Sequence, residues 1–184
     1  MRWDELFADL AAQAEAAEAA DLAGEVRDRT RAELGQLHLG DRLRPAVGTG
    51  LVVALSGAGT VRGLLVDTGP DWLLLEETGR VQLLVSSAAV LGITGVGPQV
   101  SAPGSEGELA RRLDLRWALR GLARSRAGVQ LVLVDGSVPS GTLDRVGADH
   151  VDLAEHPPGE PRRAPAVRQV RLVPLTALAA VRSS

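Results

Sequence analysis

The sequence predicts an α+β protein, mainly β, in which an N-terminal helical arm precedes two tandem small β-barrels, each of one helix and five strands. Three observations lead to this prediction. The first 34 residues are rich in alanine, glutamate and arginine, which are strong helix formers. A later stretch of the chain occurs twice. Within each copy, apolar residues alternate with period two between glycine-containing turns, as is typical of short strands.

The two copies are clearest in GLLVDTGPDWLLL (63–75) and GTLDRVGADHVDL (141–153), which lie 78 residues apart. Further on, VSSAAVLGI (85–93) matches VPLTALAAV (173–181) at an offset of 88 residues. The second copy has therefore gained ten residues, HPPGEPRRAP (156–165), whose prolines favour an exposed loop.

From this repeat we expect four segments: an acidic helical arm over 1–35, a first barrel with its leading helix over 36–96, a linker over 97–108, and a second barrel with its leading helix over 109–184. The linker is rich in glycine, proline and serine. Five strands in so short a copy favour a bent barrel, because closure removes exposed sheet edges.

Glycine and aspartate of the repeated motif are interpreted as structural. Gly63 and Gly141 fall inside strands, where glycine permits sharp bending or close backbone approach. The Gly-x-Asp steps predict turns in which glycine takes a positive φ and aspartate binds local amides. These turn residues are Gly69, Asp71, Gly147 and Asp149.

The order of helix, strand, hydrophobic-x-Gly-x-hydrophobic motif with aspartate, and closing V-P-L-x-A-L strand resembles Sm-like and related SH3-like barrels over 37–95 and 113–182. The resemblance implies RNA binding, but the asparagine of the family's first motif is replaced by Leu73 and Val151, and its Arg-Gly step is only half matched at Val181-Arg182-Ser183. The chain is also similar to uncharacterised proteins of high-GC bacteria that carry a Fis-type regulator label.

Charge is unevenly distributed along the chain. Residues 1–35 hold nine acids and four arginines, whereas the remainder holds fourteen acids and sixteen arginines. A basic stripe on the second copy's helix is predicted by arginines that recur every four residues: Arg112, Arg116, Arg120 and Arg124. Leu115, Leu119 and Leu122 lie on another side of this helix and are expected to anchor it to the barrel. Arg162, Arg163 and Arg182 are further candidates for contact with nucleic acid or an acidic partner. The stripe predicts either a solvated face or a contact with nucleic acid or an acidic partner.

Period-two alternation in the motif strands predicts that four residues face inward: Leu73, Leu75, Val151 and Leu153. Trp72 and Leu74 fall at the outward positions of the first motif strand, where the second copy has His150 and Asp152. Such a pair indicates an interface, covered by the helical arm, the other barrel or a second subunit, with cover from within the chain favoured.

The sequence contains no pattern that predicts a metal, nucleotide or catalytic site. Asp149, His150, Asp152 and His156 do not share one strand face, so we expect no metal site. Gly57, Gly59 and Gly63 have one residue too many for a dinucleotide fingerprint, and the serines have no catalytic partners. We therefore expect no catalytic residue and no cofactor.

The sequence, which has no cysteine, no signal peptide and no membrane-spanning run, predicts a cytoplasmic, non-enzymatic protein. Its expected role is binding or scaffolding through the barrels and the acidic arm, with a protein partner or self-association. The alternative is an RNA- or DNA-associated regulatory protein that uses the arginine stripe.

Overall fold

The computed structural model describes residues 13, 31–32, 34–102, 104, 107–159 and 167–183. Residues 1–38 and 39–184 form two separate compact units, and the second contains every strand that the structure describes. The arm predicted for 1–35 lies almost wholly outside the described residues, as do Arg162 and Arg163.

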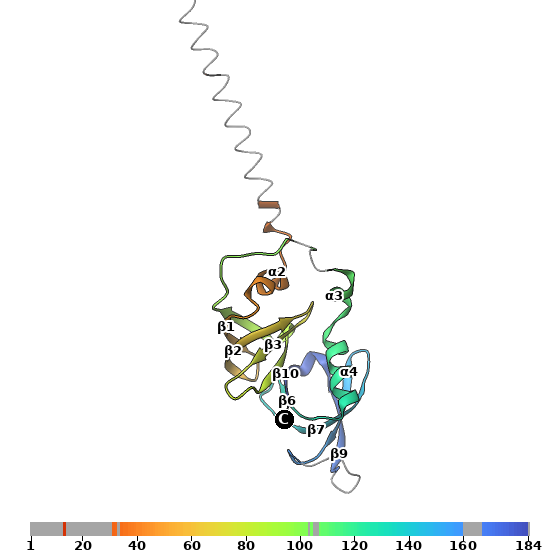
Figure 1. Cartoon of the computed structure of the whole chain (residues 1–184). Coiled ribbons are helices and arrows are strands. Elements are labelled where there is room, and N and C mark those ends of the chain that lie inside the picture. Colours follow the sequence, from red (N-terminus) through yellow and green to blue (C-terminus); the bar gives the residue numbers. More distant parts are fainter. Residues whose placement is uncertain are drawn as a thin grey trace, which may run out of the picture. The chain divides into compact units, whose positions relative to one another are not determined.

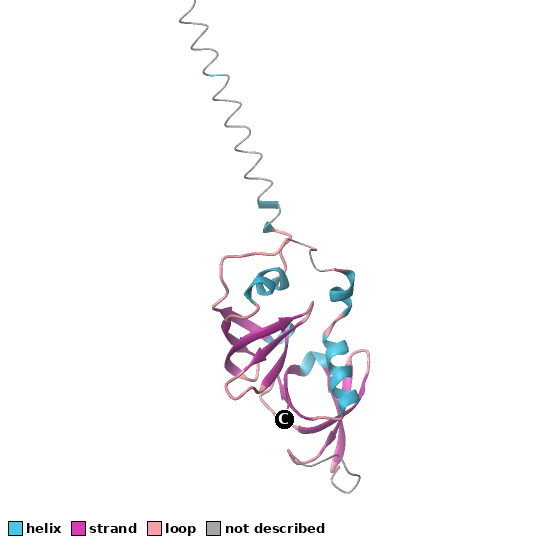
Figure 2. Cartoon of the chain, in the orientation of Figure 1, coloured by secondary structure: helices cyan, strands magenta, loops and turns pink. Residues whose placement is uncertain are grey.

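The elements of the second unit include two runs of five strands, each preceded by short helices and interrupted before its last strand by a 3-10 turn (Figures 1 and 2). In chain order they are α2 (Leu39–Leu43), η1 (Arg44–Ala46), β1 (Gly50–Leu55), β2 (Gly59–Thr68), β3 (Trp72–Glu76), β4 (Gln82–Ser86), η2 (Ser87–Ala89), β5 (Val90–Thr94), α3 (Glu108–Arg112), α4 (Leu115–Ser125), β6 (Gly128–Leu133), β7 (Ser140–Val146), β8 (His150–Glu155), β9 (Gln169–Pro174), η4 (Leu175–Ala177) and β10 (Leu178–Ser183).

The predicted fold class, a helical arm followed by two helix-plus-five-strand barrels, is wrong. The strands form one open ten-stranded sheet in the order β5-β1-β2-β3-β4-β10-β6-β7-β8-β9, with antiparallel neighbours. The physical reason is the pairing of β4 with β10, through Ala180 opposite Val85 and Val181 opposite Leu84. The backbone groups that a separate barrel would use for closure are engaged in joining the two halves.

The two halves of this sheet have the same internal order and the same register. Leu51 pairs with Gly63 in the first half and Val129 pairs with Gly141 in the second. The registers of β2–β3 and β7–β8 shift at equivalent places, after Leu65 and after Leu143. The repeated sequence thus produces a repeated strand geometry, including its bulges.

Each half of the sheet has its own hydrophobic core. Leu73 and Leu75 are fully buried in the first core, and Val151 and Leu153 are fully buried in the second, which confirms the inward direction predicted for them. Trp72 and Leu84 belong to the first half by sequence but pack into the second core. The junction of the halves is therefore a packed interior.

Helix α4 is the longest helix among the described elements, and it packs on the second core. Asp114 caps its first turn by accepting a hydrogen bond from the amide of Trp117, and Arg126 ends it in the left-handed conformation with φ 54°. Leu115 and Leu119 are buried and Leu122 is partly buried, so the anchoring face predicted for this helix is confirmed.

The prediction that Gly69 and Gly147 take a positive φ is wrong. Gly69 is required for space, because a Cβ there would lie 2.2 Å from the indole of Trp72 and 2.9 Å from the carbonyl oxygen of Leu113. A Cβ on Gly147 would lie 2.5 Å from the ring of His150, which is partly exposed and would have to move. Each glycine amide donates to the carbonyl of the residue whose ring covers it. The motif is therefore a turn folded beneath a ring.

Candidate functional site

Two hydrogen bonds fasten the first half of the sheet to the start of α4. The carboxylate of Asp71 accepts a hydrogen bond from the amide of Leu115 at 2.7 Å, and Nε1 of Trp72 donates to the carbonyl oxygen of Leu113 at 2.7 Å. The sequence predicts that Asp71 binds local amides, but its carboxylate binds an amide 44 residues away. This turn is a joint between the two copies.

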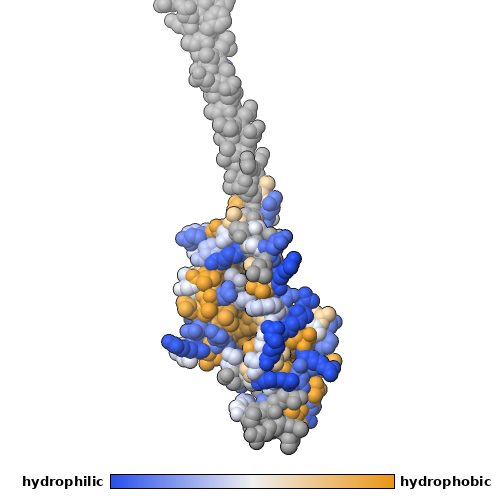
Figure 3. Space-filling model, turned by 45° about the vertical axis from the view of Figure 1, so that its right-hand side comes forward, coloured by the Kyte–Doolittle hydropathy of each residue, from blue (hydrophilic) through white to orange (hydrophobic). Residues whose placement is uncertain are grey.

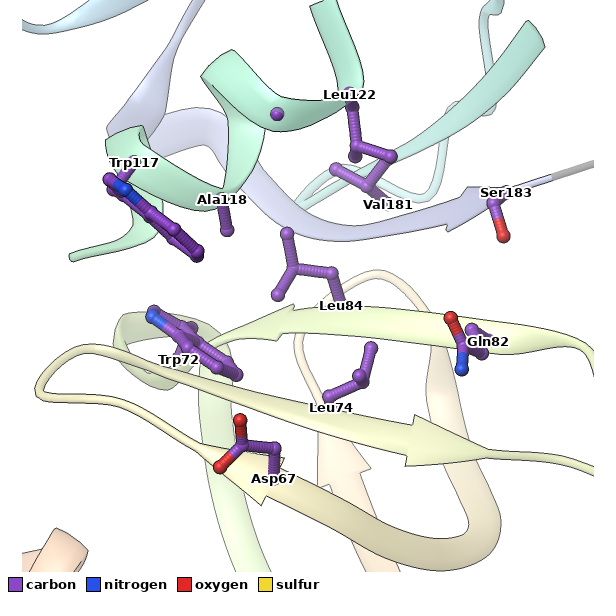
Figure 4. Close-up of a pocket in the computed structure, with 11 residues that line it drawn as sticks. Asp67, Trp72, Leu74, Gln82, Leu84, Trp117, Ala118, Leu122, Val181 and Ser183 are labelled. Carbon is purple, nitrogen blue, oxygen red and sulfur yellow. The ribbon is translucent and has the colours of Figure 1, made fainter. Parts of the chain in front are cut away.

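Trp72 and Leu74, the predicted interface pair, face the second copy of the same chain. Trp72 is buried beneath α4 and Leu74 is half-buried beside it. Above the joint lies a cleft of about 350 Å³ between α4 and the strands β3 and β4. In Figure 4, Trp117, Ala118 and Leu122 descend from α4 toward Trp72 and Leu84.

The walls of this cleft are mainly apolar, and its polar lining residues are Asp67, Gln82 and Ser183. Trp117 remains 46% exposed at its mouth. A cleft with these walls can accept an apolar side chain, and it has neither a nucleophile with a base nor paired acids for hydrolysis.

The arginine stripe on α4 divides into separate environments. Arg116 is bound to Asp114 at 2.6 Å, whereas Arg120 and Arg124 are exposed beside Arg126 and Arg145 around a shallow hollow of about 460 Å³ with Asp144. Asp144 pairs with Arg126 at 3.1 Å. Four guanidinium groups thus surround one carboxylate, an excess of positive charge that suits an anionic ligand.

The remaining predicted arginines lie apart from this hollow. Arg112 is exposed on α3. Arg182 is on β10, where it binds Glu77 at 2.8 Å across the junction of the halves. The stripe predicted on one helix is therefore divided, because Arg112 lies on α3 and Arg116 is held by Asp114, which leaves Arg120 and Arg124 exposed on α4.

Asp114 is the charged group best fixed within this region. Burial raises the pKa of its carboxyl, but the amide of Trp117, the hydrogen bond and charge of Arg116 and the charge of Arg120 together lower that pKa below its ordinary value. Asp114 stays ionised at neutral pH and holds the Arg116 guanidinium beside the start of α4.

The acid and histidine residues of the second copy do not gather into a site. His150 binds Asp149 at 2.8 Å and lies 3.8 Å from Asp152, whereas His156 is buried elsewhere against Thr142. Among the described residues, no three His, Cys, Asp or Glu side chains are grouped so that they could hold a metal ion.

The sheet has two outer strands, β5 and β9, that pair on one side only within the described part of the chain. Leu91 on β5 is 74% exposed and Leu172 on β9 is 65% exposed. Figure 3 shows hydrophobic surface (orange) among hydrophilic surface (blue) on one face of this unit. Unprotected apolar edge strands are uncommon in stable monomers, because they invite pairing with another strand.

The sequence did not predict these edges, because the order of the strands depends on which strand pairs with the second side of β4. A signal was nevertheless present in the repeat. Leu172 is the counterpart of Leu84, and Leu84 is buried at the junction, with 7% exposure. The leucine at this position of the repeat is therefore buried in the first copy and exposed in the second.

No known protein family and no curated protein matches this chain. The resemblance to Sm-like proteins therefore stays a prediction. Within the residues that the structure describes, no helix has the length and apolarity to cross a membrane.

Proposed function

We propose that this chain is a cytoplasmic, non-enzymatic scaffolding protein that binds protein partners by strand addition at the open edges of its sheet. The observation that carries the proposal is the exposure of Leu172 on β9, at a position that the first copy buries by strand pairing. Strand addition uses main-chain hydrogen bonds for affinity and alternate side chains for specificity.

Strand β9 is held in position by its neighbour β8, so its other side is available to a partner strand. β9 pairs with β8 along its whole length, and Arg171 and Gln169 bind Glu155 on that neighbour. Burial raises the pKa of Glu155, but hydrogen bonds from Arg171 and Gln169 and the charges of Arg171 and Arg168 lower it below its ordinary value. An ionised Glu155 therefore holds β9 in place while the other side of the strand stays available.

A labelled peptide of residues 174–183 tests the proposal, because it contains β10, the strand that pairs with β4. Fluorescence anisotropy of the peptide, titrated with dilute protein, is expected to show saturable binding. Leu172→Lys is expected to weaken this binding severalfold, since it places a charge on the apolar edge. The matched control is Leu64→Lys on β2, at an exposed position away from the edges. Absence of binding to the unaltered protein, or equal loss in both variants, would overturn the proposal.

The arginine hollow supports a second candidate function, association with RNA or DNA. Arg120, Arg124, Arg126 and Arg145 surround it with one carboxylate between them. Titration of labelled single-stranded RNA and duplex DNA at two salt concentrations is expected to give binding that weakens as salt rises. The variant Arg120→Ala/Arg124→Ala should lose this binding, whereas Arg62→Ala/Arg80→Ala, which removes equal charge elsewhere, should keep it. Binding that survives the first variant would exclude this hollow.

A further inference from the structure

We propose that the partner at the β9 edge is the β5 edge of a second copy of this chain, paired in the register of the internal β4–β10 junction. The inference rests on the proposed function, since it names the partner of the same edges.

The internal junction supplies the register. In it, Ala180 lies opposite Val85, Val181 opposite Leu84 and Arg182 opposite Leu83. Val85 and Val173 are equivalent in the repeat, as are Val181 and Ile93, so β9 has the place of β4 and β5 has the place of β10. Transferring the register to the free edges places Gly92 opposite Val173, Ile93 opposite Leu172 and Thr94 opposite Arg171.

The exposure of residues on β9 and β5 is consistent with a strand junction that the single chain leaves open. Val173, like Val85, is already buried by its own half of the sheet. Leu84 is buried in the second core opposite Val181 of β10, whereas its equivalent Leu172 is 65% exposed and has no such neighbour within the described chain. On the opposite edge, Leu91 is largely exposed, whereas its equivalent Ala179 is fully buried. Each free edge therefore lacks the neighbour that the other provides.

The turn beside each junction shows the same contrast. Asp71 binds the amide of Leu115 on α4, and Leu115 is buried. The equivalent of Asp71 in the other copy is Asp149, whose side chain is 90% exposed. The equivalent of Leu115 is Leu39 on α2, because LHLGDRLR (37–44) aligns with LDLRWALR (113–120), and Leu39 is also exposed. A second copy in the transferred register brings its Leu39 toward Asp149, as Leu115 approaches Asp71.

The junction between copies is expected to be weaker than the internal one. His150 and Asp152 stand where the first half has Trp72 and Leu74, so less apolar surface is buried. Association should therefore be reversible and depend on concentration. Because β9 meets β5 and not itself, the contact is heterologous, and repeated addition produces a ring if the rotation closes or a filament if it does not.

Disulfide trapping tests the register directly, because the natural chain has no cysteine. The variants Ile93→Cys and Leu172→Cys are mixed under mild oxidation, and cross-linked dimers are measured on a non-reducing gel. Directly opposed residues lie within disulfide range. We expect cross-linking in the mixture well above that of either variant alone. Leu84→Cys/Val181→Cys, the internal equivalent, should form an intrachain disulfide and shows that this register permits the bond.

Two further variants make the test specific. Leu64→Cys mixed with Leu172→Cys measures cross-linking by random collision at an exposed position away from the edges. Val170→Cys mixed with Ile93→Cys places the thiols two residues out of register, too far apart for efficient bonding. Thermal unfolding of every variant confirms that it is folded.

The inference is overturned if the 93–172 mixture gives no more dimer than the Leu64→Cys mixture, or if Leu172→Cys cross-links preferentially with itself. Peptide binding distinguishes the two levels of failure. A protein that binds the 174–183 peptide but shows no 93–172 link binds partners other than itself, and only the inference falls. A protein that does neither removes the proposed function as well.

Discussion

The indole Nε1 of Trp72 donates a hydrogen bond to the carbonyl oxygen of Leu113 at 2.7 Å, joining the first copy of the repeat to the approach of the second copy's helix. Trp72 also packs with Leu84 and Leu119. A residue that the sequence places on an outward strand face is thus the centre of the contact between the copies.

Trp72→Phe is expected to destabilise the fold by about 1–3 kcal/mol, because it leaves the Leu113 carbonyl without its partner. Trp72→Ala should cost more, about 3–5 kcal/mol, since it also opens a cavity. Urea unfolding followed by circular dichroism measures both. Trp117→Phe is the control, because Trp117 is 46% exposed. Equal costs for Trp72→Phe and Trp117→Phe would contradict the importance of this hydrogen bond.

Asp114→Ala is expected to cost about 1–2 kcal/mol, because it removes the cap of α4. Asp114→Asn retains an oxygen for the Trp117 amide and should lose less at neutral pH. The contrast between the wild-type chain and Asp114→Asn should depend on pH. The folded pKa of Asp114 is lowered, so the ionised carboxylate stabilises the fold above its unfolded pKa, and this stabilisation disappears as pH falls through the folded pKa.

Urea unfolding of the wild-type chain and Asp114→Asn, from neutral to acidic pH, checks this dependence. Their free energies of unfolding should converge at acidic pH. A difference that stays constant, or one that grows with acidity, is the contrary result.

Gly141→Ala is expected to destabilise the fold more than Gly63→Ala. A Cβ at Gly141 would lie 2.1 Å from the carbonyl oxygen of Ala154, and one at Gly63 would lie 2.8 Å from that of Glu76. Both contacts are with backbone, so a strand must move, at a cost of about 1–3 kcal/mol or more. Gly50→Ala is the control, because no atom lies within 4 Å of its added Cβ. Thermal unfolding ranks the three variants, and a destabilised Gly50→Ala with an unchanged Gly141→Ala would refute the steric account.

Thr142→Val is expected to cost about 1–3 kcal/mol despite its similar shape. His156 Nδ1 lies 3.0 Å from the carbonyl oxygen of Pro157, which can only accept, so Nδ1 carries the proton of the neutral ring. Nε2 then accepts from the hydroxyl of Thr142 at 2.8 Å, and Thr142→Val leaves this buried nitrogen unpaired. Thr142→Ser keeps the hydroxyl and should lose less stability. Chemical unfolding compares the two, and the opposite ranking would show that the methyl group matters more.

Features that depend on local pattern could be predicted from the sequence. Period-two alternation predicted the inward direction of Leu73 and Val151, and four-residue spacing predicted the buried face of α4. Both properties depend on geometry within one strand or helix, so a few neighbouring residues determine them.

Pairing across the two copies could not be predicted in the same way. Hydrophobic alternation shows that β4 has a buried face, but it does not select β10 as the neighbouring strand. The burial of Trp72, the long-range hydrogen bond of Asp71 and the exposure of Leu172 all depend on that selection. The candidate edges therefore became visible only with the sheet order.

The position of β10 has a consequence for how the protein is made. β10 lies between β4 and β6, yet it comes after every other described strand in the chain. During synthesis, β4 can pair with β3 on one side, but its other side stays without a neighbour until residues 178–183 of β10 have left the ribosome. Such late, distant pairing slows folding and leaves an adhesive strand uncovered. The nascent first half is thus the stage at which misassembly with other newly made copies is most easily seeded.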